Sequence, residues 1–72
     1  MRNWQKQTDA AGSSTWIMDD GRYQVVEKLS GSYPAYWCFR KNQIGKQQLN
    51  FVGIRNTPEL ARELCEILDG AE

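Results

Sequence analysis

The sequence predicts an α+β domain in which a three-stranded antiparallel sheet, with a possible extra N-terminal strand segment, packs on one C-terminal helix. Short aromatic and β-branched runs separated by Gly, Pro and Asn predict the strands. Apolar residues at three-and-four spacing near the end of the chain predict the helix. The 72 residues, 40% of them hydrophobic, suffice for one such core and leave no room for an enclosed substrate cleft.

The first residues are polar and show neither the three-and-four spacing of a helix nor the alternation of a strand. We therefore expect residues 1–13 to be a flexible arm and residues 14–72 to form a single sheet-plus-helix domain. Trp4 is the only large apolar side chain of this arm, and we expect it to dock on the domain. The start of the chain has no apolar stretch behind its charges, and no run approaches the length of a membrane span, so we expect a cytoplasmic protein without a membrane partner.

A hairpin is predicted where the domain begins. Trp16 to Met18 and Tyr23 to Leu29 flank an Asp-Gly dipeptide at Asp20-Gly21, which favours a type I′ turn with two positive-φ residues. Residues 30–34 form a predicted loop ending at Pro34, because proline cannot donate to a strand ladder.

Two further strands and the helix follow. We expect strands over residues 35–41 and 47–54, joined by a turn at 42–46. Thr57 is a favourable N-cap and Pro58 suits the first helical position, so the helix is predicted over 58–69 with Gly70 as the C′ residue.

One helix covers one face of a sheet, so the strands must divide their residues between a covered and an open face. Burial of the largest apolar set places on the helix side Tyr23, Val25, Trp37, Phe39, Leu49 and Phe51. The open face then carries Arg22, Gln24, Val26, Lys28, Tyr36, Cys38, Arg40, Gln48, Asn50 and Val52, with Lys41, Lys46 and Arg55 at the strand ends. This predicted face is basic and rich in amides.

The net charge of zero hides an uneven distribution. Residues 21–56 hold six Lys and Arg against one Glu, which gives +5, whereas residues 57–72 hold one Arg against five acids, which gives −4. A basic sheet face suits a polyanion, and an antiparallel ribbon fits the major groove of DNA. The predicted nucleic-acid contacts are Arg22, Gln24, Lys28, Tyr36, Arg40, Lys41, Lys46, Gln48, Asn50 and Arg55.

The composition argues against an enzyme. Without histidine the common zinc sites cannot form and the usual general base is missing, so we expect no catalytic residue, metal, cofactor or small-molecule substrate. Asp19-Asp20 before a glycine is typical of a turn. Cys38 is a candidate reactive thiol if it lies on the basic face, and Cys65 fits a small core residue.

The segment from Tyr36-Trp37-Cys38-Phe39-Arg40 through Phe51-Val52-Gly53 to Asn56-Thr57-Pro58-Glu59 resembles the Apetala-type (ethylene-response-factor) DNA-binding domain and the arm-binding domains of tyrosine integrases. The resemblance covers about half the chain. It implies a three-stranded sheet lying in the major groove of double-stranded DNA, with Arg40 as a contacting residue. It also implies that Phe51 faces the DNA, whereas the burial argument places Phe51 under the helix.

Two functions therefore stand side by side. The first is a small non-enzymatic nucleic-acid-binding accessory or regulatory protein, of phage or mobile-element type. The alternative is a protein-interaction module that uses the exposed sheet face or an edge strand, because three Trp and three Tyr exceed what one thin core needs and aromatics are enriched at protein interfaces. Trp4, Tyr33 and Tyr36 are the aromatic candidates for that role.

Overall fold

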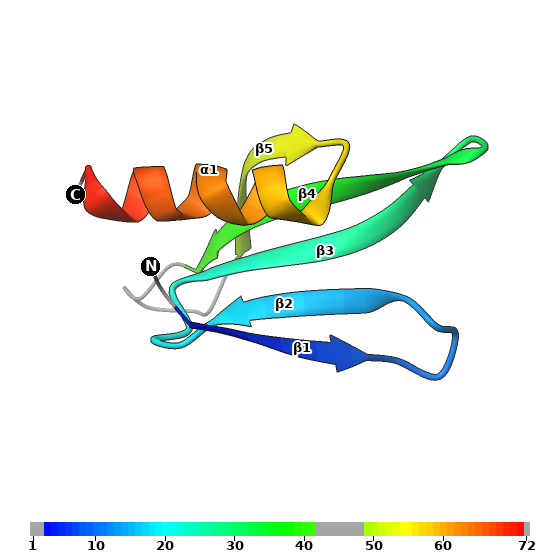
Figure 1. The fold of residues 1–72 in the computed structure, drawn as a ribbon, viewed down its shortest axis with the longest axis horizontal. Helices are drawn as coiled ribbons and strands as arrows, with labels where there is room; N and C mark the ends of the chain where they lie inside the picture. Colours follow the sequence, from blue (N-terminus) through cyan, green and yellow to red (C-terminus); the bar gives the residue numbers. More distant parts are fainter. Residues whose placement is uncertain (1–2, 42–48, 72) are drawn as a thin grey trace.

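The computed structural model describes residues 3–41 and 49–71 and shows a five-stranded antiparallel sheet with one helix packed on it (Figure 1). The strands follow chain order across the sheet: β1 (Trp4–Thr8), β2 (Ser14–Met18), β3 (Tyr23–Ser30), β4 (Tyr33–Lys41) and β5 (Leu49–Arg55). The helix is α1 (Pro58–Gly70). The α+β class is confirmed, but the prediction of a three-stranded sheet is wrong.

Strand β1 lies within residues 1–13, where a flexible arm and no strand was predicted. Its residues pair antiparallel with β2 in the register Trp4↔Met18 to Thr8↔Ser14. The turn that joins the two strands is held by Asp9, whose Oδ1 atom accepts the backbone N–H groups of Ala11 and Ser13 at 2.9 Å each. Four of the five β1 residues are exposed, so the strand has no apolar alternation that sequence reading could detect.

Both described turns between β2 and β4 differ from the prediction, and the second of them lengthens β3 and β4. Residues 19–22 join β2 to β3, and the only positive φ among them is the +76° of Gly21, so the expected type I′ turn is wrong. Gly31, with φ of +67°, and Ser32 join β3 to β4 in a two-residue turn. Glycine in the first central position is typical of a type II′ turn, which extends the strands into the expected loop.

This extended β3–β4 hairpin projects beyond the rest of the sheet (Figure 1). Pro34 lies inside β4, opposite Leu29, although proline was expected to exclude a strand there. The pairing of β4 with β5 begins only at Tyr36↔Arg55, so Pro34 lies past the end of that neighbour and its missing N–H costs no ladder bond.

The predicted helix is confirmed at its N-terminus. The Thr57 Oγ1 atom accepts the Leu60 backbone N–H at 3.2 Å, and Pro58 occupies the start of the helix. Gly70 was expected as a C′ residue, but it is the last helical residue and Ala71, with φ of −84°, caps the end. The N–H of Ala71 bonds to the carbonyl groups of Ile67 and Leu68, so no left-handed residue is needed.

The core lies between α1 and the near face of the sheet. It consists of buried residues from β2, β3, β4 and the helix: Trp16, Met18, Tyr23, Val25, Tyr36, Cys38, Ala61 and Cys65. Ala61 and Cys65 are fully buried, and such small side chains let the helix approach the strands closely. Over the described ranges, no helix combines the length and apolar character that crossing a bilayer requires.

The face assignment made from sequence is correct for β3 and reversed for β4. Tyr23 and Val25 face the helix, but Cys38 pairs across from Val25 and lies under the helix, which puts Trp37 and Phe39 on the opposite face. The reason is the close approach of the helix at position 38: the Cys38 thiol lies 3.5 Å from the Ala61 carbonyl oxygen, so a large aromatic side chain at this position would not fit.

A β-bulge reverses the expected side of Phe51 as well. Cys38 pairs with Gly53 and Phe39 with Phe51, so Val52 is the extra residue in β5. Val52 packs against the core, and Phe51 lies on the face away from the helix beside Phe39. Leu49 pairs with Lys41 and shares that face, so its predicted burial under the helix is wrong too.

Candidate functional site

The face of the sheet that points away from α1, called here the open face, carries a cluster of three aromatic rings. The Phe51 ring lies 5.1 Å from the Trp37 ring and 6.1 Å from the Phe39 ring, measured between centroids. Lys28 extends from β3 over the same rings, with its Nζ atom 5.0 Å from the centroid of Trp37 and 5.8 Å from that of Phe39. We call Trp37, Phe39 and Phe51 the aromatic cluster.

Aliphatic residues surround the aromatic cluster. Phe51 is 49% exposed, and its β5 neighbours Leu49 and Ile54 are 47% and 42% exposed. Val26 pairs with Trp37 across the sheet, and Ile17 lies one strand further, opposite Gln24. An antiparallel sheet face that stays in water usually carries polar residues at alternate positions, so this apolar surface is typical of a face that a partner covers.

The charges of the open face have one sign. Strand alternation places Lys28 and Lys41 on it, together with the amide side chains of Gln5, Gln7 and Gln24. Among the strand positions that the structure describes on this face, none holds Asp or Glu. The open face is therefore apolar at its centre and weakly basic around it.

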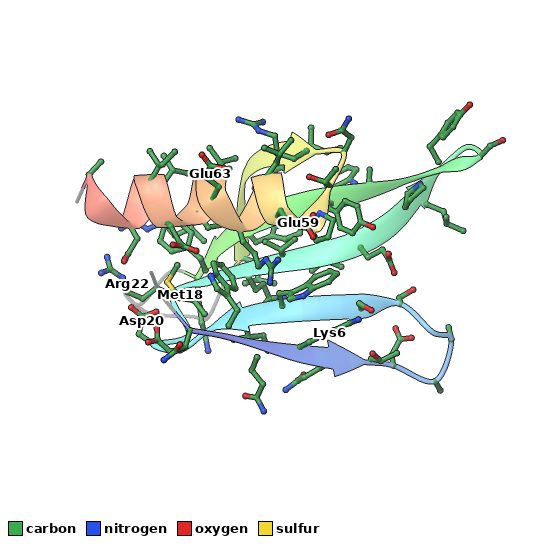
Figure 2. The ribbon with its side chains drawn as sticks, viewed as in Figure 1. Lys6, Met18, Asp20, Arg22, Glu59 and Glu63 are labelled. Atoms are coloured by element: carbon green, nitrogen blue, oxygen red, sulfur yellow. The ribbon has the colours of Figure 1, made fainter. Side chains whose placement is uncertain are left out.

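The ten residues predicted to contact nucleic acid do not share this face. Gln24, Lys28 and Lys41 lie on it. Four others belong to the side that α1 covers, because of their pairing or burial: Tyr36, Arg40, Asn50 and Arg55. Arg22 forms an ion pair with Asp69 of the helix at 3.3 Å, and Figure 2 shows it beside the β2–β3 turn. Lys46 and Gln48 lie outside the described residues.

Tyr36 serves the core. Its side chain is 9% exposed, and its hydroxyl donates a hydrogen bond to a Glu27 carboxylate oxygen at 3.1 Å. Burial raises the pKa of the Tyr36 phenol, and the hydrogen bond with the Glu27 carboxylate raises it further. The other Glu27 oxygen accepts the backbone N–H of Ser14 at 3.3 Å, so this contact joins β2, β3 and β4.

The two cysteines meet beneath the helix. Cys38 is fully buried and its thiol donates to the Ala61 carbonyl oxygen at 3.5 Å, so the expectation of an exposed reactive thiol on a basic face is wrong. A hydrogen bond with Cys38 and burial both raise the pKa of the Cys65 thiol. Cys65 is a small core residue, as the sequence predicted.

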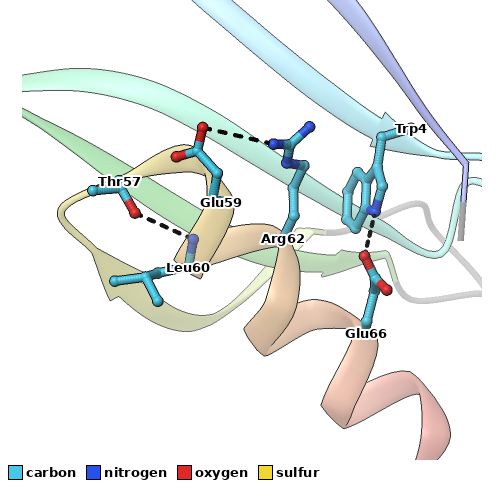
Figure 3. A network of polar contacts seen from close by, with 6 residues as sticks. All are labelled: Trp4, Thr57, Glu59, Leu60, Arg62 and Glu66. Carbon is cyan, nitrogen blue, oxygen red and sulfur yellow. Dashed lines mark hydrogen bonds and ion pairs between the residues drawn. The ribbon is translucent and has the colours of Figure 1, made fainter. Parts of the chain in front are cut away.

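The β1 side of the helix is held by polar contacts (Figure 3). The Trp4 indole N–H donates to a Glu66 carboxylate oxygen at 3.0 Å, which ties β1 to α1 and confirms that Trp4 docks on the domain. Arg62 lies 6.0 Å from the centroid of the Trp16 ring and 4.0 Å from a Glu59 oxygen. The polar side chains on this side of the helix are therefore engaged in contacts within the chain.

The acidic pair Asp19-Asp20 lies in the β2–β3 turn, as the sequence predicted, and Asp20 stabilises that turn. An Asp20 carboxylate oxygen accepts the Arg22 backbone N–H at 3.0 Å. Within residues 3–41 and 49–71, no group of three or more His, Cys, Asp or Glu side chains is arranged to hold a metal ion.

The aromatic cluster was missed by burial reasoning, although the sequence held a signal for it. Trp37, Cys38 and Phe39 alternate large, small and large, and the small residue is the one that a close-packed helix requires.

Comparison of the chain with models of protein families, with curated proteins and with solved structures finds no match. The surface must therefore be interpreted from its own chemistry.

Proposed function

We propose that this protein is a non-enzymatic interaction module that binds a partner protein through the open face. The observation that carries the proposal is the aromatic cluster, in which Phe51 is exposed and Trp37 and Phe39 are half-buried, with Ile17, Val26, Leu49 and Ile54 on the same face. Aromatic side chains grouped at the centre of an apolar patch are the usual source of affinity at protein interfaces.

The charges of the open face specify the partner's chemistry. Lys28 and Lys41 have no carboxylate beside them among the described strand positions of this face, so an apolar partner surface that bears Asp or Glu is complementary. Lys28 packs over two rings of the aromatic cluster, and a partner carboxylate placed above it would pair with an ammonium group that is already oriented.

A second candidate is single-stranded nucleic acid. It is supported by one observation, the combination of three aromatic rings with two lysines on a face without carboxylates, because bases stack on aromatic side chains while cations hold the phosphates. Of the residues predicted to contact double-stranded DNA that the structure describes, only Gln24, Lys28 and Lys41 lie on the open face; the others are on the helix side: Arg22, Tyr36, Arg40, Asn50 and Arg55.

The test compares Phe51→Asp with Leu29→Asp. Both positions expose a large apolar side chain, but Leu29 pairs with Pro34 near the tip of the β3–β4 hairpin and, by alternation with Lys28, lies on the other face of the sheet from the aromatic cluster. We expect the native chain and Leu29→Asp to capture the same partner from an extract, and Phe51→Asp to lose it while keeping the native circular dichroism spectrum. A captured protein that binds all three chains equally would contradict the proposal.

A titration of labelled single-stranded oligonucleotide at low and high salt separates the two candidates. Binding that weakens steeply with salt and is lost in Phe51→Asp would replace the protein partner with nucleic acid, because release of counterions governs that dependence. We expect no such binding by the native chain.

A further inference from the structure

The two cysteines of the chain come from elements that are far apart in the sequence, and they meet at one contact in the core. Cys38 lies inside β4 and Cys65 lies inside α1, and both side chains are fully buried. The sequence contains no other cysteine. Any disulfide within this chain must therefore join these two residues.

Two contacts place the sulfur atoms beside each other. The Cys38 thiol lies 3.5 Å from the Ala61 carbonyl oxygen, which belongs to the helical turn that precedes Cys65. Side chains of a helix lean toward its N-terminus, so the Cys65 side chain leans toward the same turn. The Cys65 thiol donates a hydrogen bond to the Cys38 sulfur, which makes the two sulfur atoms neighbours in the core.

The side chains around this pair are small enough for the helix and the sheet to come close together. Ala61 is fully buried, and Gly53, which pairs with Cys38 from β5, lies against Leu64 of the helix. A disulfide requires its two Cβ atoms to lie about 3.5 to 4.5 Å apart, and large side chains between two layers would prevent that approach. The packing at Cys38 and Cys65 therefore suits a covalent bond between the layers.

We propose that Cys38 and Cys65 form an intramolecular disulfide when the protein meets a small-molecule disulfide of the glutathione class, and that this bond locks α1 onto the sheet. One protein thiol loses its proton, and its thiolate attacks the reagent, which forms a mixed disulfide and releases one reagent thiolate. The second protein thiol then loses its proton and attacks the protein sulfur of the mixed disulfide, which releases the other reagent thiolate. The two protein thiols lose two electrons in total, and one reagent disulfide is reduced to two thiols.

Burial sets the condition for this reaction. Neither thiol is exposed while α1 is docked, so the reagent reaches them only when the helix opens from the sheet. A bound reagent molecule does not fit into a core where Cys38 and Cys65 are fully buried, whereas formation of the disulfide expels it. Redocking of the helix therefore favours the second step over a mixed disulfide that persists.

The disulfide adds a covalent connection between the middle of the helix and the sheet. The chain joins α1 to β5 at the N-terminus of the helix, and noncovalent contacts such as the hydrogen bond between Trp4 and Glu66 hold the remainder. A bond between positions 38 and 65 also restricts the unfolded chain, because it closes the loop that contains β5. We therefore expect the oxidised form to be more stable than the reduced form.

The experiment incubates the reduced native chain with oxidised glutathione and measures its mass and its thermal unfolding. We expect the chain to lose the mass of two hydrogen atoms without binding glutathione, and trypsin to release residues 29–40 linked to residues 63–72. The thermal midpoint should rise by about 10 °C or more above that of the reduced chain. Cys65→Ala is the matched control, because it can bind glutathione only at Cys38 and its midpoint should not rise.

Three results would overturn the proposal: a native chain that stays reduced or keeps bound glutathione, a disulfide between two chains, or an oxidised chain whose midpoint is no higher than that of the reduced chain. The native chain alone gives these readouts, so the test does not depend on the folding of Cys65→Ala. Cys38 lies on the face of β4 opposite the aromatic cluster. Capture of a partner by the open face is measured separately with Phe51→Asp in reducing buffer, so failure of one proposal is distinguishable from failure of the other.

Discussion

Gly53 of β5 lies against Leu64 of α1 so closely that a Cβ atom at position 53 would come within 2.5 Å of the Leu64 Cδ2 atom. The φ of Gly53 is not positive, so close approach and not backbone conformation requires glycine here. The helix and the last strand therefore pack directly against each other at this point.

Replacement of Gly53 by alanine should therefore destabilise the fold. We expect the free energy of unfolding in urea to fall by about 1 kcal/mol, the low end of what overpacking costs, because the atom that must move is a terminal methyl of the half-buried Leu64 side chain. In a Leu64→Ala background the same substitution should cost much less. Equal costs in the two backgrounds would show that Leu64 is not the cause.

The indole groups of Trp4 and Trp37 give a matched pair of substitutions. Trp4→Phe removes the hydrogen bond to Glu66 and should lower the free energy of unfolding by about 1 to 3 kcal/mol, since the acceptor is charged. Trp37 Nε1 is buried without a hydrogen-bond partner among the described residues, so Trp37→Phe removes no such bond and should cost less. Urea unfolding of both variants measures the two losses in free energy of unfolding. A larger loss for Trp37→Phe than for Trp4→Phe would contradict the prediction.

The N-cap of the helix predicts a third result. Thr57→Ala removes the acceptor of the Leu60 N–H and should destabilise the protein by about 1 kcal/mol, whereas Thr57→Ser keeps the hydroxyl and should cost little. Thermal unfolding followed by circular dichroism measures both. Similar midpoints for Thr57→Ala and Thr57→Ser would mean that the cap contributes nothing.

The buried phenol of Tyr36 predicts a pH dependence. Because its pKa in the folded chain lies above the ordinary 10.0, the unfolded chain loses this proton first as pH rises. The contribution of Tyr36 to stability is thus complete below pH 10.0 and is lost as pH rises through the higher folded pKa.

Urea unfolding at successive pH values, with Tyr36→Phe as the reference, measures this dependence. At neutral pH the variant should be less stable, because it lacks the hydrogen bond to Glu27. The advantage of the native chain should shrink above pH 10.0. An advantage that stays constant to higher pH would show that the phenol has no raised pKa.

Local signals were sufficient for the helix and for the approximate positions of four strand segments along the chain. Thr57 and Pro58 specify the start of α1 by short-range chemistry, and Gly21 and Gly31 mark turns wherever the sheet lies. These features depend only on residues that are close in the sequence, so they can be predicted from it.

The open face could not be predicted in the same way, because it depends on long-range packing. The position of Trp37 follows from how closely Ala61 and Cys65 approach Cys38, and that of Phe51 follows from the bulge at Val52. A shift of one residue exchanges the two faces of a strand, so an assignment that simply maximised buried apolar area selected the wrong face for β4. The pairing of β1 was hidden for a related reason, since an exposed edge strand needs no apolar alternation.

The meander order of the sheet has a consequence for how the chain acquires its structure. Every strand pairs with the strand next to it in the sequence, so hairpins can form from nearby residues and folding should be rapid for a sheet protein. The helix follows all five strands, however, and until it docks both faces of the sheet expose apolar residues, Val25 and Cys38 on one side and Trp37 and Phe39 on the other. During synthesis the nascent sheet is therefore most prone to aggregation just before residues 58–70 become available.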